Sequence, residues 1–180
     1  GTGEPAHREA AMTVRLLLEF LEAGIEPVSA LRTLNAALML RGEEGGGFTT
    51  IDLLALQRPT GAGTLYKYGA APSYLKRGGC VTRVTGQSLP AGLQQGADGP
   101  ESTRLSLQAG SFFVMVSDGV ADETDDEWLQ NLMAGWSGQS AEALASLILS
   151  ESRTRRGLRD DCAVLVLHLP KMEDSPPRQV

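Results

Sequence analysis

The chain has 180 residues, of which 42% are hydrophobic, enough for one ordinary globular domain or most of one. Its 16 basic and 22 acidic residues give a formal net charge of −6, which argues against nucleic-acid binding, where a basic surface is expected. No uninterrupted apolar run is long enough to cross a membrane, and no signal-peptide pattern is present.

The first part of the chain predicts two amphipathic helices, at residues 5–23 and 27–41. Apolar side chains recur there at three- and four-residue spacing, and a glycine follows each segment. From residue 48 the pattern changes to short strands separated by turns that contain Gly or Pro. We expect strands at 48–57, 63–68, 73–77, 81–85, 104–108 and 111–117, with a long loop at 89–102.

Two more helices and a last strand complete the predicted domain. The helices are expected at residues 126–136 and 141–155, the second with Ser140 as its N-cap, and the strand at residues 162–169. Residues 171–180 are expected to form a disordered tail, so the domain spans residues 1–170. Helices segregated from antiparallel strands predict the α+β class, with helices layered on sheet faces.

The two cysteines indicate the redox environment of the chain, and its first residues indicate whether it is a fragment. Cys80 and Cys162 fall at the edge of or inside strand-like segments, so we expect small core residues in a reducing cytosol rather than a disulfide. The chain begins at Gly1 without an initiator Met, and a helical pattern follows almost at once. We therefore expect a fragment of a longer protein, with any membrane anchor outside this chain.

Acidic residues stand where two apolar runs meet loops. Asp118 follows the run 111–117 in a Ser-Asp-Gly sequence, and Asp160 with Asp161 precedes the run 162–169. Because Asp-Gly is a common turn signal, a simple turn role is one interpretation. The other is a site in which Asp118 and Asp160, with oxygens from water or backbone, hold Mg²⁺ or Mn²⁺ and so activate a water for attack on a phosphate ester. A two-metal site needs a further carboxylate, for which the chain offers no candidate at a matching strand end.

Other kinds of chemistry have little support in the sequence. There is no Gly-x-Ser-x-Gly motif, and no glycine-rich stretch leads into a helix, which argues against a nucleophile elbow and a phosphate loop. We interpret His7 as a surface residue, His168 as a packed strand residue and Asp52 as structural.

Basic residues gather in two places. Lys76 and Arg77 close a strand, and Arg153, Arg155 and Arg156 cluster shortly before Asp160. Such a cluster is typical of a solvated helix end, where it complements the dipole. The alternative is that it faces an anionic substrate such as a phosphoryl group.

Ordered segments along nearly the whole chain resemble the metal-dependent protein phosphatase family (PPM, protein phosphatase 2C type). The Ser-Asp-Gly sequence at Asp118, followed some forty residues later by Asp160 and Asp161 and an apolar strand, carries this resemblance. More narrowly, the chain is similar to the cytoplasmic phosphatase domains of the stage II sporulation protein E kind. The similar segments are residues 31–35, 40–41, 50–53, 69–78, 89–92 and 153–155, of which Pro-Ser-x-x-Lys-Arg-Gly and Leu-Pro-x-Gly are the more specific.

The resemblance implies an antiparallel β-sandwich flanked by helix pairs, two Mn²⁺ or Mg²⁺ ions, and hydrolysis of phosphoserine by metal-activated water. It implies a bacterial phosphatase acting on a phosphorylated anti-sigma-factor antagonist during sporulation, in a cytoplasmic domain. Asp118 and Asp160 are then metal ligands, Asp161 a neighbour of the site and Gly1 a ligand through its backbone carbonyl. The family's bridging Asp would stand immediately before Gly1, after strands that are missing here, so we expect this chain to be inactive or nearly so.

Two alternatives to that function stay open: a non-catalytic phosphatase-like module that binds a phosphoprotein or dimerises, and a related phosphatase of a stress-response sigma-factor pathway. The helices at residues 5–23 and 27–41 resemble a family switch element, so we expect partner or homodimer contacts there. A small-residue surface formed by Ala30, Ala36 and Ala37 suits such close packing.

Overall fold

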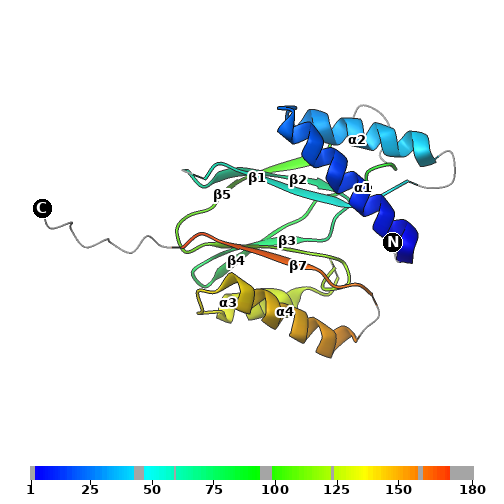
Figure 1. The fold of residues 1–180 in the computed structure, drawn as a ribbon. Helices are drawn as coiled ribbons and strands as arrows, with labels where there is room; N and C mark the ends of the chain where they lie inside the picture. The colour runs from blue at the N-terminus through cyan, green and yellow to red at the C-terminus, as the bar shows by residue number, and fades with distance from the viewer. Residues whose placement is uncertain are drawn as a thin grey trace, which may run out of the picture. The chain divides into compact units, whose positions relative to one another are not determined.

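The computed structural model describes residues 3–42, 47–58, 60–93, 99–122, 124–157 and 160–170. The chain forms two compact units, one made of residues 1–70 and 85–105 and the other of residues 71–84 and 106–180 (Figure 1). Gly1 and the expected tail at 171–180 lie outside the described residues. Across the described ranges, no helix combines the length and the apolar character needed to traverse a bilayer.

The first unit packs two helices against a three-stranded sheet. The helices are α1 (Gly3–Glu22) and α2 (Pro27–Gly42), and the strands β1 (Ile51–Leu56), β2 (Ala62–Tyr68) and β5 (Glu101–Ser106) lie in the order β1-β2-β5. Gly24, with a φ of 80°, ends α1, and Pro27 suits the first turn of α2 because its missing N–H costs nothing there. The core is formed by Leu17, Ala30, Leu31, Leu34, Leu38, Ile51, Tyr68 and Ala91.

A buried ion pair joins β1 to β2. Asp52 and Lys67 are directly opposite in the antiparallel register, and the Lys67 ammonium lies 2.7 Å from both carboxylate oxygens of Asp52. Their side chains are 12% and 2% exposed, respectively. Burial lowers the pKa of Lys67, and the Asp52 carboxylate partly counters that shift. The pair supports the structural role expected for Asp52.

Three expectations for this unit need correction. Ala30 is fully buried in the core, so it does not belong to a small-residue surface, whereas Ala36 and Ala37 are exposed. The first strand begins at Ile51 rather than at residue 48, and Thr49 instead forms an isolated bridge with Ala91. Strand β5 begins at Glu101, inside the segment predicted as loop. Its first four residues are all polar, so they show no alternation of apolar and polar residues that would predict a strand.

The second unit is a four-stranded sheet with two helices. The strands β3 (Ser73–Arg77), β4 (Cys80–Val84), β6 (Phe112–Val116) and β7 (Val164–His168) lie in the order β4-β3-β6-β7, and each neighbouring pair is antiparallel. The helices α3 (Glu127–Gly135) and α4 (Ala141–Arg156) cover the sheet (Figure 1). Their apolar side chains pack with those of β3 and β6 in a core of Tyr74, Phe112, Val114, Val116, Val120, Ala121, Leu129, Met133, Leu144 and Ile148. Mixed helices and antiparallel sheets confirm the α+β class.

A polar network inside this unit fixes the start of α3 to the sheet. The Tyr74 hydroxyl donates to the Asp126 carboxylate at 2.9 Å, the Arg83 guanidinium lies 2.9 Å from the same oxygen, and the Gln130 amide donates to the other oxygen at 3.0 Å. Burial and the Asp126 carboxylate raise the pKa of Tyr74 well above its ordinary value. Tyr74 is therefore a neutral donor.

The cysteines only partly match their predicted core role. Cys80 is exposed, because it opens the edge strand β4, and Cys162 is half-buried. Strand β7 starts at Val164, later than predicted, and Cys162 lies in the loop before it. His168 is half-buried as expected, with its ring stacked on Phe112 at a centroid distance of 4.0 Å. His7 is exposed.

Candidate metal centre

Asp118 lies in a turn at the end of β6. The backbone N–H of Ser117 donates to the Ala163 carbonyl at 3.0 Å, which extends the pairing with the β7 side by one residue. The Val120 N–H then donates to the Ser117 carbonyl at 2.9 Å and closes the turn. Asp118 is exposed, and its Oδ1 accepts a hydrogen bond from the Gly119 N–H at 3.1 Å. The buried strand thus presents this carboxylate at a fixed point of the surface.

Asp160 occupies the corresponding corner before β7. It is exposed, and its Oδ1 accepts from the Asp161 N–H at 2.8 Å. Because β6 and β7 are antiparallel, with Val116 opposite Val164, the end of β6 and the start of β7 meet at one edge of the sheet. The two acidic corners, 44 residues apart in sequence at their contact, therefore come together.

Side-chain hydrogen bonds clamp these corners to each other. The Ser117 hydroxyl donates to the Asp161 carbonyl at 3.1 Å and accepts from the Ala163 N–H at 2.9 Å. The Cys162 thiol donates to the Gly119 carbonyl at 3.3 Å. Residue 119 must be glycine for reasons of space, since a Cβ there would lie 2.4 Å from the Asp161 carbonyl oxygen. The relative position of the two carboxylates is thus set by the backbone.

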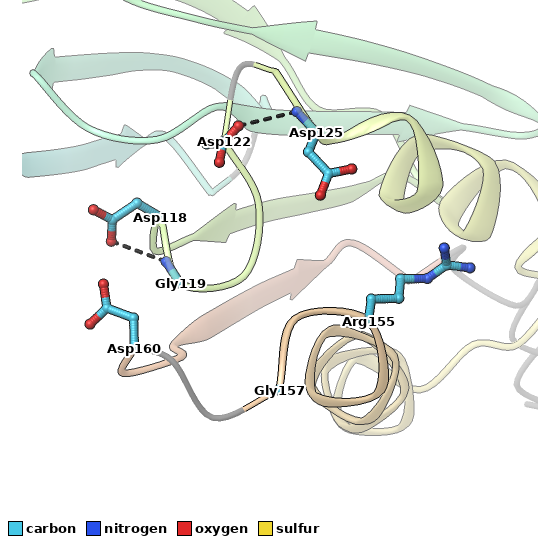
Figure 2. A pocket seen from close by; sticks show the side chains of 7 residues that line it. All are labelled: Asp118, Gly119, Asp122, Asp125, Arg155, Gly157 and Asp160. Atoms are coloured by element: carbon cyan, nitrogen blue, oxygen red, sulfur yellow. Dashed lines mark hydrogen bonds between the residues drawn. The ribbon is translucent and has the colours of Figure 1, made fainter.

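Both carboxylates face a pocket of about 600 Å³ (Figure 2). Its lining consists of Asp118, Gly119, Asp122, Asp125, Arg155, Gly157 and Asp160. Among the described residues of the lining, four carboxylates and one guanidinium make a cavity whose side-chain donors are chiefly oxygens. Hard divalent cations such as Mg²⁺ and Mn²⁺ prefer this set of ligands, and no Cys or His side chain lines the described pocket to favour a softer metal.

Sequence reasoning missed Asp122 and Asp125. Asp122 organises its own loop, because its Oδ1 accepts from the backbone N–H groups of Thr124 and Asp125 at 2.9 and 3.1 Å and from the Thr124 hydroxyl at 2.6 Å. The signal was present as a run of acids directly after the Ser-Asp-Gly sequence. These acids do not adjoin an apolar run themselves, and their segment has the pattern of an ordinary turn.

The other predicted site residues take different places. Asp161 is exposed and does not line the pocket; its main-chain carbonyl, rather than its carboxylate, contacts the Asp118 corner. Arg155 lines the pocket and lies 5.4 Å from the ring centre of Trp128 and 3.6 Å from the Glu151 carboxylate. In Figure 2 its guanidinium points away from the Asp118 and Asp160 carboxyl groups.

The arrangement supplies a pair of ligands rather than a complete cage. Within the described ranges, no group of three or more His, Cys, Asp or Glu side chains is placed to hold one ion. The four pocket carboxylates are therefore spread around the cavity, with Asp118 and Asp160 at the clamped corners. The predicted ligand Gly1 falls outside the described residues, so the structure places only the two aspartates of that set.

Comparisons with known proteins identify the family. The family model described as stage II sporulation protein E (SpoIIE) matches residues 1–170. Stage II sporulation protein E of Bacillus subtilis (strain 168) is 33% identical over 176 residues, and that of Priestia megaterium is 30% identical over 187 residues. These alignments cover 94% and 98% of this chain but 21% and 32% of the relatives, so the chain spans about a fifth to a third of their length.

A solved structure supports the same assignment. The PP2C phosphatase domain of SpoIIE from Bacillus subtilis, determined with a fragment of its regulatory domain, superposes with a TM-score of 0.84 at 32% identity. The match covers 94% of this chain and 51% of that one. The PPM phosphatase-like fold class predicted from the sequence is confirmed. The chain belongs to the stage II sporulation protein E family.

Proposed function

We propose that this chain is the phosphatase domain of a metal-dependent protein serine/threonine phosphatase, with Asp118 and Asp160 as metal ligands. The observation that carries the proposal is the clamp between their two corners. Hydrogen bonds through Ser117 and Cys162 hold two carboxylates from distant parts of the sequence against one acidic pocket. A simple turn role for Asp118 explains its local Gly119 contact but not this convergence.

The residues present fit Mn²⁺ or Mg²⁺, and each has a defined task. When bound, such ions lower the pKa of water and neutralise charge on a phosphoryl group. Asp118 and Asp160 would hold the ions, and the backbone bonds to their Oδ1 atoms orient both carboxyl groups. Ser117 and Gly119 keep the corners at a fixed separation. A rigid spacing matters, because a displacement of about 1 Å in a reacting group can cost about 100-fold in rate.

We propose as substrate a phosphoserine on an anti-sigma-factor antagonist, in a sporulation pathway of a bacterial cytoplasm. The support is family membership together with the Pro-Ser-x-x-Lys-Arg-Gly sequence at residues 72–78, which resembles the sporulation branch more than the stress-response branch. A further proposal is that α1 and α2 contact a partner or a second copy, because Val14, Leu18 and Leu40 are 57%, 53% and 69% exposed. A membrane anchor, if the protein has one, would lie outside this chain.

We also propose that the 180-residue chain alone has little activity. It contributes two clamped aspartates, whereas the family resemblance implies a third, bridging carboxylate before Gly1. With that ligand absent, ions would bind weakly and the attacking water would be poorly positioned.

The test compares two proteins in Mn²⁺-dependent hydrolysis of a phosphoserine protein. One is the chain itself. The other is a chimaera in which Gly1 is preceded by the segment that comes before the matched region in the Bacillus subtilis protein. The chimaera should be active, and Asp118→Asn and Asp160→Asn should each lower its rate by about 100-fold or more. Glu142→Gln, an exposed acid in the first turn of α4, is the matched control. A chimaera that binds no Mn²⁺ and hydrolyses nothing would instead favour a non-catalytic binding module. Full activity of the 180-residue chain would refute the proposal of low activity.

A further inference from the structure

A second pocket lies at the opposite end of the four-stranded sheet. It encloses about 480 Å³ between the end of β3 at residues 76–78, the turn 108–112 before β6, and the loop 136–139 after α3. Lys76 is paired with Phe112 in the antiparallel register. Asp118 follows Phe112 by six residues, so the two pockets are about 20 Å apart along β6 at about 3.3 Å per residue. This cavity, which we call the basic pocket, is thus separate from the acidic one.

The basic pocket contains a buried lysine whose described hydrogen-bond acceptors are both backbone carbonyls. Lys76 is 5% exposed, and its ammonium donates to the backbone carbonyls of Gly78 and, at 3.4 Å, of Ala134. Burial lowers its pKa. Lys67, the other buried lysine described, has the Asp52 carboxylate at 2.7 Å. A buried ammonium is costly unless an anion accompanies it, and none of the described side chains that line the pocket around Lys76 is acidic.

The rest of the lining fits an anion attached to an apolar body. Arg77 adds a second cation, and no Asp or Glu is among the described residues that line the pocket. Phe112 and Trp136 provide aromatic surface. The indole is held in place by the chain beside it, since a Cβ on Gly138 would lie 2.4 Å from the Trp136 ring. The indole N–H is buried and has no hydrogen-bond acceptor in the described part of the chain.

A purely structural role for Lys76 accounts for only part of this. The Ala134 carbonyl belongs to the last turn of α3, where a cation caps free carbonyls and complements the helix dipole. That role explains one contact of Lys76. Arg77 likewise has one structural contact, since its guanidinium donates to the Ser106 carbonyl. Neither contact explains why the described lining contains no Asp or Glu, or why the indole N–H beside it has no acceptor among the described residues.

We propose that the basic pocket binds a small organic anion, whose carboxylate or phosphate lies against Lys76 and Arg77 and whose apolar or aromatic body lies against Phe112 and Trp136. This site is independent of the metal centre and of the proposed phosphatase activity. Anion binding there requires no divalent cation.

The test uses Trp136 as a reporter. The chain has two tryptophans, and Trp128→Phe leaves Trp136, the one that lines this pocket, as the sole tryptophan, which is excited selectively at wavelengths beyond the absorption of tyrosine. That variant is titrated at constant ionic strength with benzoate, with the neutral isostere benzamide and with inorganic phosphate. We expect a saturable fluorescence change with benzoate at a dissociation constant of about 1–10 mM, as befits so small a ligand. Benzamide should give no saturable change, and phosphate, which lacks the body, should bind more weakly.

Charge variants in the same background decide the result. Lys76→Met and Arg77→Gln should each weaken benzoate binding by about 10-fold or more, whereas Arg153→Gln, which removes an exposed positive charge outside the pocket, should leave it unchanged. If Lys76→Met does not fold, the Arg77→Gln and Arg153→Gln comparison decides alone. Equal responses to benzoate and benzamide would overturn the proposal, as would unchanged benzoate affinity in Arg77→Gln.

Discussion

Replacing Gly119 by Ala should push the two acidic corners apart. The added Cβ would lie 2.4 Å from the Asp161 carbonyl oxygen and 3.4 Å from the Asp160 Cβ. Carbon and carbonyl oxygen rarely approach closer than about 3.3 Å, so the backbone at residues 160–161 must move by about 0.9 Å. The obstacle is backbone rather than a flexible side-chain end, which leaves no inexpensive way to absorb the change.

Two measurable effects follow from that displacement. Overpacking of this kind costs about 1–3 kcal/mol of unfolding free energy. Metal–ligand distances tolerate only about 0.2 Å, so a shift of about 0.9 Å between Asp118 and Asp160 should weaken Mn²⁺ binding by about 10-fold or more. Because the Ser117 hydroxyl donates to the Asp161 carbonyl, the same shift also strains the clamp.

Urea unfolding and calorimetric titration with Mn²⁺ measure these effects, the latter in the chimaera described above, where binding should be tighter. Gly135→Ala is the matched control, because a Cβ on Gly135, the last residue of α3, meets no atom within 4 Å. It should be neutral or stabilise the fold by up to about 1 kcal/mol. If Gly119→Ala matches Gly135→Ala in both unfolding midpoint and Mn²⁺ affinity, the argument that glycine at 119 fixes the ligand spacing is refuted.

Two further predictions concern buried polar groups. Asp52→Asn should lower the free energy of unfolding in urea by about 3–5 kcal/mol, because it leaves the Lys67 ammonium buried without the Asp52 carboxylate. The double change Asp52→Leu with Lys67→Met should recover most of that loss. Since the pKa of Lys67 is lowered in the fold, the unfolded chain binds more protons than the folded chain. The unfolding free energy of Asp52→Asn should therefore rise between pH 7 and about 10. An unfolding free energy that does not change with pH in this range would contradict the argument. Tyr74→Phe should cost about 1–2 kcal/mol by losing the hydrogen bond to Asp126. Because the folded pKa of Tyr74 is raised, the wild-type chain should lose stability above pH about 10 more steeply than Tyr74→Phe, and parallel profiles would contradict it.

Most of the element order could be predicted from the sequence because strong local signals mark it. Glycine and proline limit α1 and α2, and Ser140 caps α4 by accepting from the Ala143 N–H at 3.1 Å. Strand β6 is buried on both faces and therefore forms a continuous apolar run. Strand β5 alternates polar exposed and half-buried residues, which gives a weak signal, and its start was missed.

The candidate site, too, could be predicted from the sequence only where a strong local signal marks a residue. Asp118 and Asp160 could be found because each adjoins an apolar run, and strand pairing then determines that they meet. Asp122 and Asp125 reach the pocket through a loop whose path depends on hydrogen bonds made by Asp122 itself, which no periodicity encodes. Nor could the sequence separate Arg155, which lines the pocket, from the exposed Arg153 two positions earlier, because helix orientation decides between them.

The opposite charges at the two ends of β6 make the two proposals separable in one experiment. The described lining of the acidic pocket contains four carboxylates, which disfavour a phosphoserine dianion, and under the proposed function divalent cations at Asp118 and Asp160 would offset that charge. The basic pocket carries Lys76 and Arg77 and attracts anions without any metal. A chelator should therefore abolish hydrolysis by the active chimaera while the Trp136 response to benzoate persists. Loss of both signals on chelation would show that the basic pocket depends on the metal centre and contradict their independence.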